Sequence, residues 1–274
     1  ELFIFPPFPT LCDNIIVNAK EGISKREDKN FKKMNGETML ESQKITILIP
    51  AYNEAPRLPK VLEVVSKIEW VDEIVVIDSH SQDGTQDVAR QFPGDVIYLD
   101  SDRGKGAALV EGIRRKKDSD IYVFLDADLV ALTEEHILAL VNPLIEDQSL
   151  VMTIGVFEEG RRWGDLAQKL FPILNGMRGV RGEWVRNLPD FSWTRFGVEV
   201  FLTRIARENK VNIELVPLTG LAHYHKEEKY GFFPGLYHRI KMYKEIVQTF
   251  FLYKKRIEGY SKVTGEEEKD GVMA

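Results

Sequence analysis

Two aspartates separated by one small residue are the feature of this sequence most suggestive of chemistry. Asp126 and Asp128 flank Ala127 and follow the apolar run 121–125, which is typical of a buried strand. Two carboxylates placed so closely repel each other unless a cation joins them. Mg²⁺ or Mn²⁺ suits such oxygen ligands and often completes its shell with substrate phosphates. The motif predicts a divalent-metal site; the alternative is two surface acids that cap the next helix.

A glycine-lysine turn precedes the helix that leads into the Asp-Ala-Asp strand. It reads Arg103-Gly104-Lys105-Gly106. Glycines let the backbone approach a ligand closely, and a helix N-terminus beside a lysine attracts phosphate. The spacing is not that of a P-loop. The turn therefore indicates a phosphate contact, or else an ordinary basic turn.

The elements that must position these groups alternate regularly from residue 45 onward. Short β-branched runs at 45–49, 73–78, 96–99 and 121–125 predict buried strands, and the segments 56–68, 85–90 and 105–116 between them predict helices, with Thr85 as a cap of the second. This alternation predicts an α/β fold with a mostly parallel sheet and helices on both faces. Ligands bind outside the carboxyl ends of such strands. The polar clusters 50–54, 78–81 and 126–128 are therefore expected at one edge of the sheet.

The second half of the chain is less regular. It predicts strands at 150–157 and 213–216, helices at 164–175, 198–209 and 234–257, and a loop or short strand at 179–187. The opening 44 residues are first apolar and Pro-rich and then Lys/Glu-rich, which indicates a loosely ordered extension.

Composition narrows the function classes. The net charge of −6 argues against general nucleic-acid binding. A lone cysteine, Cys12, excludes an intrachain disulfide and favours a reducing compartment. We find no apolar run long enough to span a membrane and expect no signal peptide, so the expected location is cytoplasmic.

Four motifs occur in one order: Ile-Pro-Ala-Tyr-Asn-Glu, Val-Val-Ile-Asp-Ser-His-Ser-Gln-Asp-Gly-Thr, Gly-Lys-Gly-Ala-Ala-Leu and Leu-Asp-Ala-Asp. Over residues 45–230 the chain thereby resembles the GT-A glycosyltransferases of family 2 and the related glucosyl-3-phosphoglycerate synthases. The resemblance implies a GT-A catalytic domain at 45–230, with nucleotide-sugar binding at 45–130 and the acceptor side at 131–230. Residues 231–274 would add an amphipathic helix and a tail.

The resemblance also implies the roles of particular residues in binding a UDP- or GDP-sugar. The expected nucleotide-sugar contacts are Pro50, Ala51, Tyr52, Glu54, Asp78, Ser79, Gly104, Lys105, Asp126 and Ala127. Asp126 and Asp128 would hold Mg²⁺ or Mn²⁺, and a histidine far down the chain would join them. That histidine is His223, with His225 as the alternative. His80 stands where the family often has a small residue.

Acceptor-side candidates come from two segments. The stretch 195–200 resembles a Gly-x-Glu element of the closer relatives, so Glu199 is the first candidate for a catalytic base and Asp190 the second; the alternative for Glu199 is an acid at a helix N-terminus. If transfer is retaining, Glu199 would instead orient the acceptor. Glycines and guanidinium groups suit an anionic acceptor, which makes candidates of Arg178, Arg181, Gly182 and Glu183.

Several alternatives stay open at this point. The helix 234–257 has an apolar stripe and a basic face, which predicts packing on the core, or else contact with an anionic membrane surface at the inner face or with a second subunit in a homodimer. Glucosyl-3-phosphoglycerate synthesis and transfer to a polyprenyl phosphate are narrower versions of the function. The rivals from other classes are a nucleotidyltransferase and a non-catalytic nucleotide-sugar-binding protein.

Overall fold

The computed structural model describes residues 43–157 and 175–223, and within the C-terminal part residues 244–245, 248–249, 251–253 and 255–257. The expected N-terminal extension to residue 42, residues 164–174 of the expected helix 164–175, and His225 lie outside the described residues. The predicted helix 234–257 is covered only by its C-terminal part, whose described residues are helical.

The described strands form a mixed, mainly parallel sheet in the order β3-β2-β1-β4-β7-β6-β8. β7 pairs antiparallel with β4 and β6, whereas the other neighbouring pairs are parallel. The strands are β1 (Ile45–Ala51), β2 (Glu73–Asp78), β3 (Asp95–Tyr98), β4 (Ile121–Phe124), β6 (Leu150–Phe157), β7 (Arg178–Arg181) and β8 (Asn212–Leu218). A second, two-stranded sheet pairs β5 (Leu129–Val130) with β9 (Ala222–His223).

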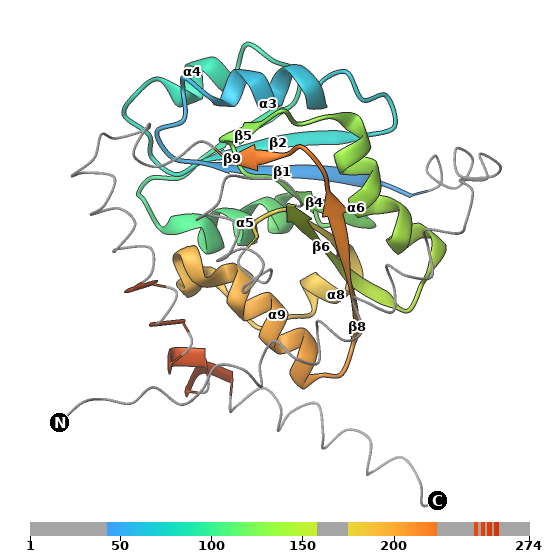
Figure 1. Ribbon diagram of the computed structural model, residues 1–274. Coiled ribbons are helices and arrows are strands. Elements are labelled where there is room, and N and C mark those ends of the chain that lie inside the picture. Colours follow the sequence, from blue (N-terminus) through green and yellow to red (C-terminus); the bar gives the residue numbers. More distant parts are fainter. Residues whose placement is uncertain are drawn as a thin grey trace, which may run out of the picture.

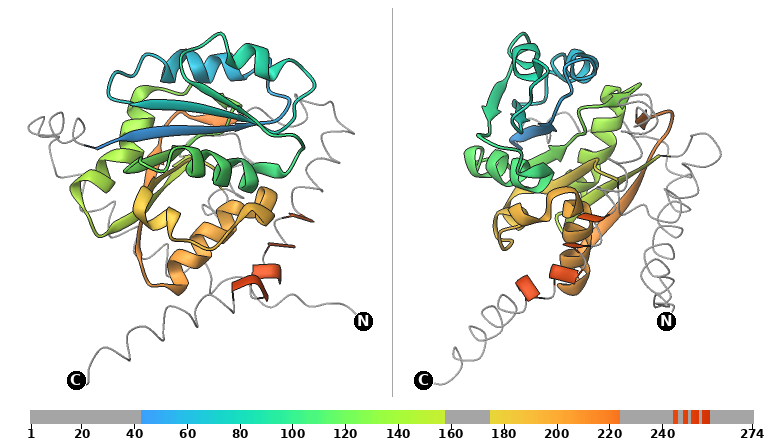
Figure 2. Two further views of the ribbon diagram at one scale, coloured as in Figure 1. Left: turned by 180° about the vertical axis from the view of Figure 1, so that it is seen from behind. Right: turned by 90° about the vertical axis from the view of Figure 1, so that its left-hand side faces the viewer.

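Helices cover both faces of the large sheet (Figure 1), as the sequence predicts. Alternate residues of β1 face opposite layers: Ile47 packs with one cluster and Leu48 with the other. The first layer contains α3 (Leu58–Val65), α4 (Thr85–Ala89) and α6 (Glu134–Glu146). The second contains α5 (Gly104–Arg115), α8 (Gly182–Arg186) and α9 (Val198–Glu208). The view from behind in Figure 2 shows the same layering.

Three local predictions differ from the structure. Helix α6 lies in a segment for which the sequence analysis expects no element, although Thr133 and His136 form a capping box at its start. Residues 182–186 are helical, not loop or strand. Thr85 does not cap α4, since Gly84 occupies the N-cap position with a φ of 87° and the Thr85 hydroxyl instead accepts a hydrogen bond from the Glu54 amide.

Within the part of the chain that the structure describes, no helix is both long enough and apolar enough to cross a membrane.

Candidate functional site

The strand order brings the three predicted polar clusters to one edge. β1 lies between β2 and β4, so the loops that follow these strands are neighbours. The first two loops are joined directly: the Asn53 amide donates to the Ser81 hydroxyl at 2.8 Å, and the Gln82 amide donates to the Asn53 side chain at 2.9 Å. The expectation that the clusters share an edge is confirmed.

Asp78 is the buried carboxylate of this edge. Its Oδ1 accepts hydrogen bonds from the amide and the hydroxyl of Ser81. Its Oδ2 is buried and has no hydrogen-bond partner among the described residues. A buried acceptor left without a donor costs free energy, and an ordered water or a bound ligand is the ordinary way in which proteins satisfy it. Asp78 therefore offers one carboxylate oxygen to a donor group from outside the chain.

Lys105 joins two acids that lie far apart in the sequence. Its ammonium nitrogen lies 2.5 Å from Oδ1 of Asp126 and 2.7 Å from Oε1 of Glu199. The side chains of all three are largely buried, at 11%, 19% and 9% exposure. The glycine-lysine turn, the Asp-Ala-Asp segment and the Gly-x-Glu helix, which are separate motifs in the sequence, thus meet around one cation.

The electrostatics of this cluster depend on a second cation. Burial lowers the pKa of Lys105, but the carboxylates of Asp126 and Glu199 outweigh that effect, and the pKa lies above its ordinary value. Burial lowers the pKa of Arg178 to about 10, although the same two carboxylates oppose the shift. Both bases are therefore protonated at neutral pH, and the two acids lie in a positive environment.

The Asp-Ala-Asp segment is a turn between β4 and β5. Ala127 is buried, whereas Asp126 and Asp128 are both partly exposed. β5 begins at the residue after Asp128, and its Leu129 is the backbone partner of His223 on β9. The backbone of the predicted histidine therefore passes beside the aspartates. No group of three or more potential metal-ligand side chains occurs among those the structure describes, and the His223 side chain is outside that set.

The remaining nucleotide-side candidates line the same loops. Tyr52 is 39% exposed, while Ala51 and Ser79 are buried and joined by a backbone hydrogen bond from the Ser79 amide. Glu54 is buried and paired with Arg57 at 3.0 Å, on the turn that leads into α3. His80 adopts a φ of 68°, and its ring hydrogen-bonds the Tyr98 hydroxyl at 2.5 Å. His80 thus combines a left-handed backbone with a side-chain contact to the last residue of β3.

Arg178, which the sequence analysis assigns to acceptor binding, is enclosed within the protein. This residue is 1% exposed and lies on β7. Its guanidinium donates to the Glu199 carbonyl at 3.1 Å and the Thr203 hydroxyl at 3.0 Å, and contacts the sulfur of Met152 at 3.3 Å. A guanidinium enclosed in this way supports the start of α9 and offers little surface to an acceptor.

The other residues assigned to acceptor binding, Arg181, Gly182 and Glu183, lie away from the aspartates. β7 runs antiparallel to β4, and Arg178 is the partner of Phe124 whereas Arg181 is the partner of Ile121. Arg181 therefore lies at the edge opposite to Asp126. Its guanidinium donates to the carbonyls of Leu144 at 2.6 Å and Leu150 at 2.9 Å, so it satisfies the C-terminal end of α6.

Gly182 and Glu183 follow Arg181 at that opposite edge. A Cβ at Gly182 would overlap the carbonyl oxygen of Ser119, just before β4 begins. Glu183 is exposed in the first turn of α8. The second base candidate, Asp190, is an exposed acid whose carboxylate accepts hydrogen bonds from the amide and hydroxyl of Ser192. None of these three contacts the Lys105 cluster through a hydrogen bond between described residues.

Two contributors to the site are not among the residues predicted for it from the sequence. A Cβ at Gly176 would overlap the Lys105 ammonium and lie 2.5 Å from an Asp126 oxygen, so this glycine lets the pair form. Arg195, which opens the stretch that resembles the Gly-x-Glu element, adopts a φ of 50° and ψ of −117° in η2 (Ser192–Gly197). The roles of both residues depend on contacts with distant segments, which local sequence does not specify.

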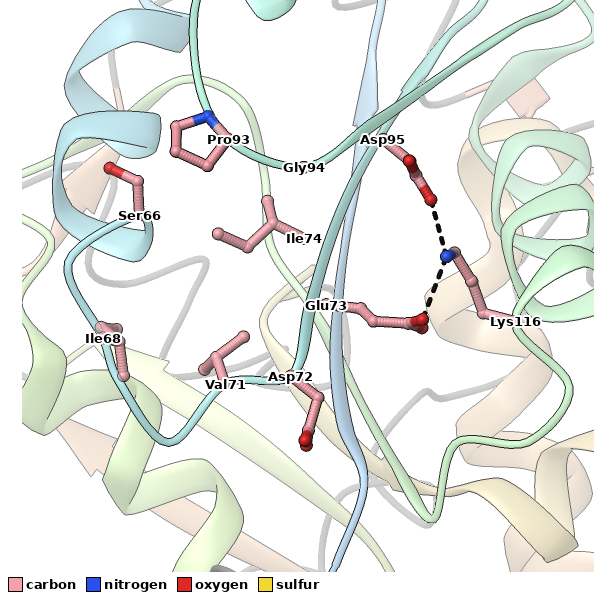
Figure 3. Close-up of a pocket in the computed structure, with 10 residues that line it drawn as sticks. All are labelled: Ser66, Ile68, Val71, Asp72, Glu73, Ile74, Pro93, Gly94, Asp95 and Lys116. Atoms are coloured by element: carbon pink, nitrogen blue, oxygen red, sulfur yellow. Dashed lines mark hydrogen bonds and ion pairs between the residues drawn. The ribbon is translucent and has the colours of Figure 1, made fainter.

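A pocket of the described structure lies away from the candidate site (Figure 3). It lies by Glu73 and Asp95, the first residues of β2 and β3, and hence at the edge opposite to Asp78. Lys116 bridges these two acids at 3.1 and 2.6 Å. The pocket is separate from the candidate site.

The layered sheet, the β7 reversal and the polar edge define a GT-A fold. The chain belongs to glycosyl transferase family 2, whose model matches residues 46–202. A 4,4'-diaponeurosporenoate glycosyltransferase of Staphylococcus haemolyticus is 39% identical over 113 residues, which cover 39% of this chain and 29% of the relative. A glucosyl-3-phosphoglycerate synthase of Petrotoga mobilis is 29% identical over 146 residues, covering 48% and 43%. The chain thus spans less than half the length of these relatives.

Solved structures share the fold. Glucosyl-3-phosphoglycerate synthase from Mycobacterium tuberculosis, in complex with Mn²⁺, UDP and glucosyl-3-phosphoglycerate, superimposes with a TM-score of 0.63 over 82% of this chain and 86% of that chain, at 23% identity. The same protein in complex with Mg²⁺ and UDP gives a TM-score of 0.57 over 71% and 80%, at 24% identity. The predicted fold and family resemblance are confirmed.

Proposed function

We propose that this protein is a metal-dependent glycosyltransferase that moves a sugar from a nucleoside-diphosphate sugar to a hydroxyl or phosphate-bearing acceptor. The observation that carries the proposal is the ion cluster in which Lys105 joins Asp126 to Glu199. It places a donor-side cation, a metal-ligand candidate and an acid-base candidate within contact distance. A catalytic protein of this family needs these three kinds of group together, whereas a scaffold has no physical need for them.

The donor's nucleoside would lie against the loops after β1 and β2. Asp78 has one buried carboxylate oxygen free of hydrogen bonds with the described residues, which suits an N–H or hydroxyl donor from a base or a ribose. The Asn53 amide and the Ser81 hydroxyl hold that carboxylate in place through consecutive hydrogen bonds. Tyr52, which is partly exposed, provides an aromatic face nearby in the same loop.

The donor set suits Mg²⁺ or Mn²⁺. Asp126 and Asp128 supply partly exposed oxygen ligands, and His223, whose backbone is paired beside them, would supply an imidazole. When bound, the cation would neutralise the diphosphate as it leaves. The structural neighbours with Mn²⁺ or Mg²⁺ and UDP in their crystals support this choice of metal. Lys105 would then be placed to contact the donor's phosphates from the N-terminal turn of α5.

Glu199 is the proposed acid-base or orienting group on the acceptor side. Its carboxylate contacts Lys105 at 2.7 Å and can accept a proton or a hydrogen bond from an acceptor hydroxyl. The first acceptor to test is 3-phosphoglycerate, because the Mycobacterium tuberculosis neighbour was crystallised with its glucosylated product. With Arg178 and Arg181 engaged elsewhere, the described residues do not specify the acceptor's anion site.

The first experiment is a thermal-shift screen with UDP-glucose, UDP-galactose, UDP-GlcNAc, GDP-mannose and GDP-glucose, each with and without Mn²⁺ or Mg²⁺. A ligand that binds only the native state raises Tm. We expect one donor to raise Tm only with metal, and Asp128→Ala to abolish the shift. Asp118→Ala is the matched control, because this acid pairs with Lys44 at the opposite edge of the sheet. No metal-dependent shift with any nucleotide-sugar would refute the proposal.

A second experiment addresses the acceptor. The donor identified in the screen would be incubated with 3-phosphoglycerate or with a polyprenyl phosphate, and the product's anomeric configuration read by NMR. Glucosylation of 3-phosphoglycerate supports the narrower function. A product formed only on the polyprenyl phosphate would rule out glucosyl-3-phosphoglycerate synthesis. It would still support the broader proposal of a glycosyltransferase.

A further inference from the structure

Arg195 lies where three segments of the candidate site meet. Its Nε donates to Oε1 of Glu245 at 3.0 Å. Glu245 belongs to the C-terminal segment, by which we mean the described helical residues between 244 and 257. The two terminal nitrogens of Arg195 donate to Asp102, one to the carboxylate at 3.1 Å and one to the carbonyl at 3.3 Å. All three guanidinium nitrogens are therefore used, in a planar fork that a lysine could not reproduce.

The backbone at this residue is under steric constraint. Its φ of 50° with ψ of −117° is rare for a residue with a side chain. The α5 N-terminus packs directly on it: a Cβ at Gly104 would lie 2.9 Å from the Cα of Arg195, and a Cβ at Gly106 would overlap the hydroxyl of Thr194. The residue between these glycines is Lys105. The turn that carries Lys105 therefore lies close against the backbone of Thr194 and Arg195.

The C-terminal segment approaches the same place by a second contact. The Thr249 hydroxyl donates to the Thr194 carbonyl at 3.1 Å, and a Cβ at Gly197 would overlap that hydroxyl oxygen. Glu245 is 8% exposed, and its Oε2 is buried without a hydrogen-bond partner among the described residues. Its carboxylate therefore depends on the hydrogen bond from Arg195, and that bond is sensitive to any change at either end.

We propose that Arg195 is a positioning residue that ties the C-terminal segment to the loop before α5 and thereby holds the Lys105–Glu199 pair in register. Arg195 reaches the donor side through Asp102, whose carboxylate also accepts a hydrogen bond from the Gly104 amide at 2.9 Å. Four residues further on, Glu199 follows in α9. A displacement of the C-terminal segment is therefore transmitted to both ends of the ion pair. That the pair acts in catalysis rests on the proposed function; the mechanical coupling does not.

The test is amide hydrogen exchange on the full chain without ligand. The amides of residues 108 and 109 report opening of the first turn of α5, and those of 202 and 203 report the first turn of α9. In Arg195→Gln we expect exchange at both turns to rise at least about tenfold, as loss of a charge-assisted hydrogen bond implies. Glu245→Gln should raise exchange at the same amides by less, because an amide oxygen still accepts.

Arg204→Gln is the matched control. Arg204 also joins α9 to the C-terminal segment, with its guanidinium 4.1 Å from the Tyr253 ring centre, and it pairs with Glu208 at 2.9 Å, but it does not contact the loop before α5 through any described hydrogen bond. We expect no change at residues 108 and 109 in this variant. Unchanged exchange there in Arg195→Gln, or a rise no larger than in Arg204→Gln, would overturn the proposal.

A ligand-binding arm separates this inference from the proposed function. The affinity for UDP with Mn²⁺, measured by calorimetry, should fall in Arg195→Gln and recover partly in Arg195→Lys, because Lys105 loses its position without being altered. If the unmodified protein binds neither UDP nor GDP in the presence of Mn²⁺ or Mg²⁺, the proposed function fails, and the exchange arm still decides whether Arg195 couples the two segments.

Discussion

At the residue scale, the decisive feature is that Lys105 neutralises two acids from distant parts of the chain. An ammonium group within 2.7 Å of both Asp126 and Glu199 compensates the repulsion between these carboxylates. Removing one partner of a largely buried ion pair leaves the other charge uncompensated, which is more costly than the pair's net contribution to stability. The chemistry and the stability of this site are therefore linked.

The variant Lys105→Met should lower the free energy of unfolding at pH 7 by about 3 kcal/mol, the low end of the range for breaking a buried pair, because Asp126 is partly exposed. The pKa of Lys105 is raised in the folded state, so its contribution is fully present below the unfolded value of about 10.4 and is lost as pH rises through the folded value. The difference between variant and wild type, measured by urea unfolding, should stay constant from about pH 7 to 10. A difference that decays within that window would contradict the assignment.

Arg181→Met tests whether this arginine supports the fold or binds the acceptor. The change leaves the carbonyls of Leu144 and Leu150 without their donor and should cost about 1–3 kcal/mol of stability. The donor's KM and the acceptor's KM should both stay within about twofold of wild type, because the residue lies at the opposite edge from Asp126. Arg115→Met, which removes a half-exposed partner of Glu111, should cost less than about 1 kcal/mol. A selective rise in the acceptor's KM would show instead that Arg181 binds the acceptor.

At the element scale, the first turn of α5 has to come close to η2. Glycines at 104 and 106 permit this, since any side chain there would meet Arg195 or Thr194. The same approach brings Lys105 to Glu199 at the start of α9. The glycine-lysine turn thus serves helix packing as well as the contact with phosphate that its sequence suggests.

A pair of glycine variants separates the two requirements of this turn. Gly84 and Gly104 both have left-handed backbones, with φ values of 87° and 81°, but a Cβ at Gly84 would meet nothing within 4 Å. Gly84→Ala should therefore cost only the conformational strain of about 1–2 kcal/mol. Gly104→Ala should cost about 1–3 kcal/mol more because of the clash with Arg195. Chemical denaturation of both variants measures the difference, and equal losses would mean that the contact with Arg195 relaxes freely.

At the scale of the whole molecule, ligand binding and folding stability should be coupled. The candidate site gathers loops after β1, β2 and β4 with the starts of α5 and α9, so a bound donor would stabilise most of the described fold at once. Among the described residues, one oxygen of Asp78 has no hydrogen-bond partner and can accept a hydrogen bond from a ligand, and Asp126 and Asp128 are partly exposed to solvent.

Saturation with UDP and Mn²⁺ at about 100 times Kd should raise the free energy of unfolding by about 2.7 kcal/mol. Asp78→Asn should weaken UDP binding at least about tenfold, because an amide that turns its NH₂ toward the ligand offers no acceptor there. Calorimetry would measure the affinity and denaturant unfolding the stability. Equal affinity in Asp78→Asn would show that this residue does not contact the nucleotide. The assignment of the metal site would be unaffected, because Asp128→Ala tests it separately.

The sequence by itself determined the class of fold and the edge at which polar groups gather. Buried parallel strands have a strong local signal, and the carboxyl ends of neighbouring parallel strands necessarily share an edge. Asp78 and Asp126 belong to motifs at the ends of strands, and Lys105 and Glu199 belong to motifs at the starts of helices. Their order along the chain is sufficient to indicate the family.

The tertiary structure alone decided which charged residues share contacts. Arginine spacing in 178–183 looks the same whether the segment is a loop or a strand, and only the antiparallel pairing of β7 sends Arg181 away from the aspartates. The contacts of Arg195 likewise depend on Asp102 and Glu245, which are 93 and 50 residues away along the chain. Local patterns encode local structure, whereas a side chain's partners depend on the packing of segments that no local pattern specifies.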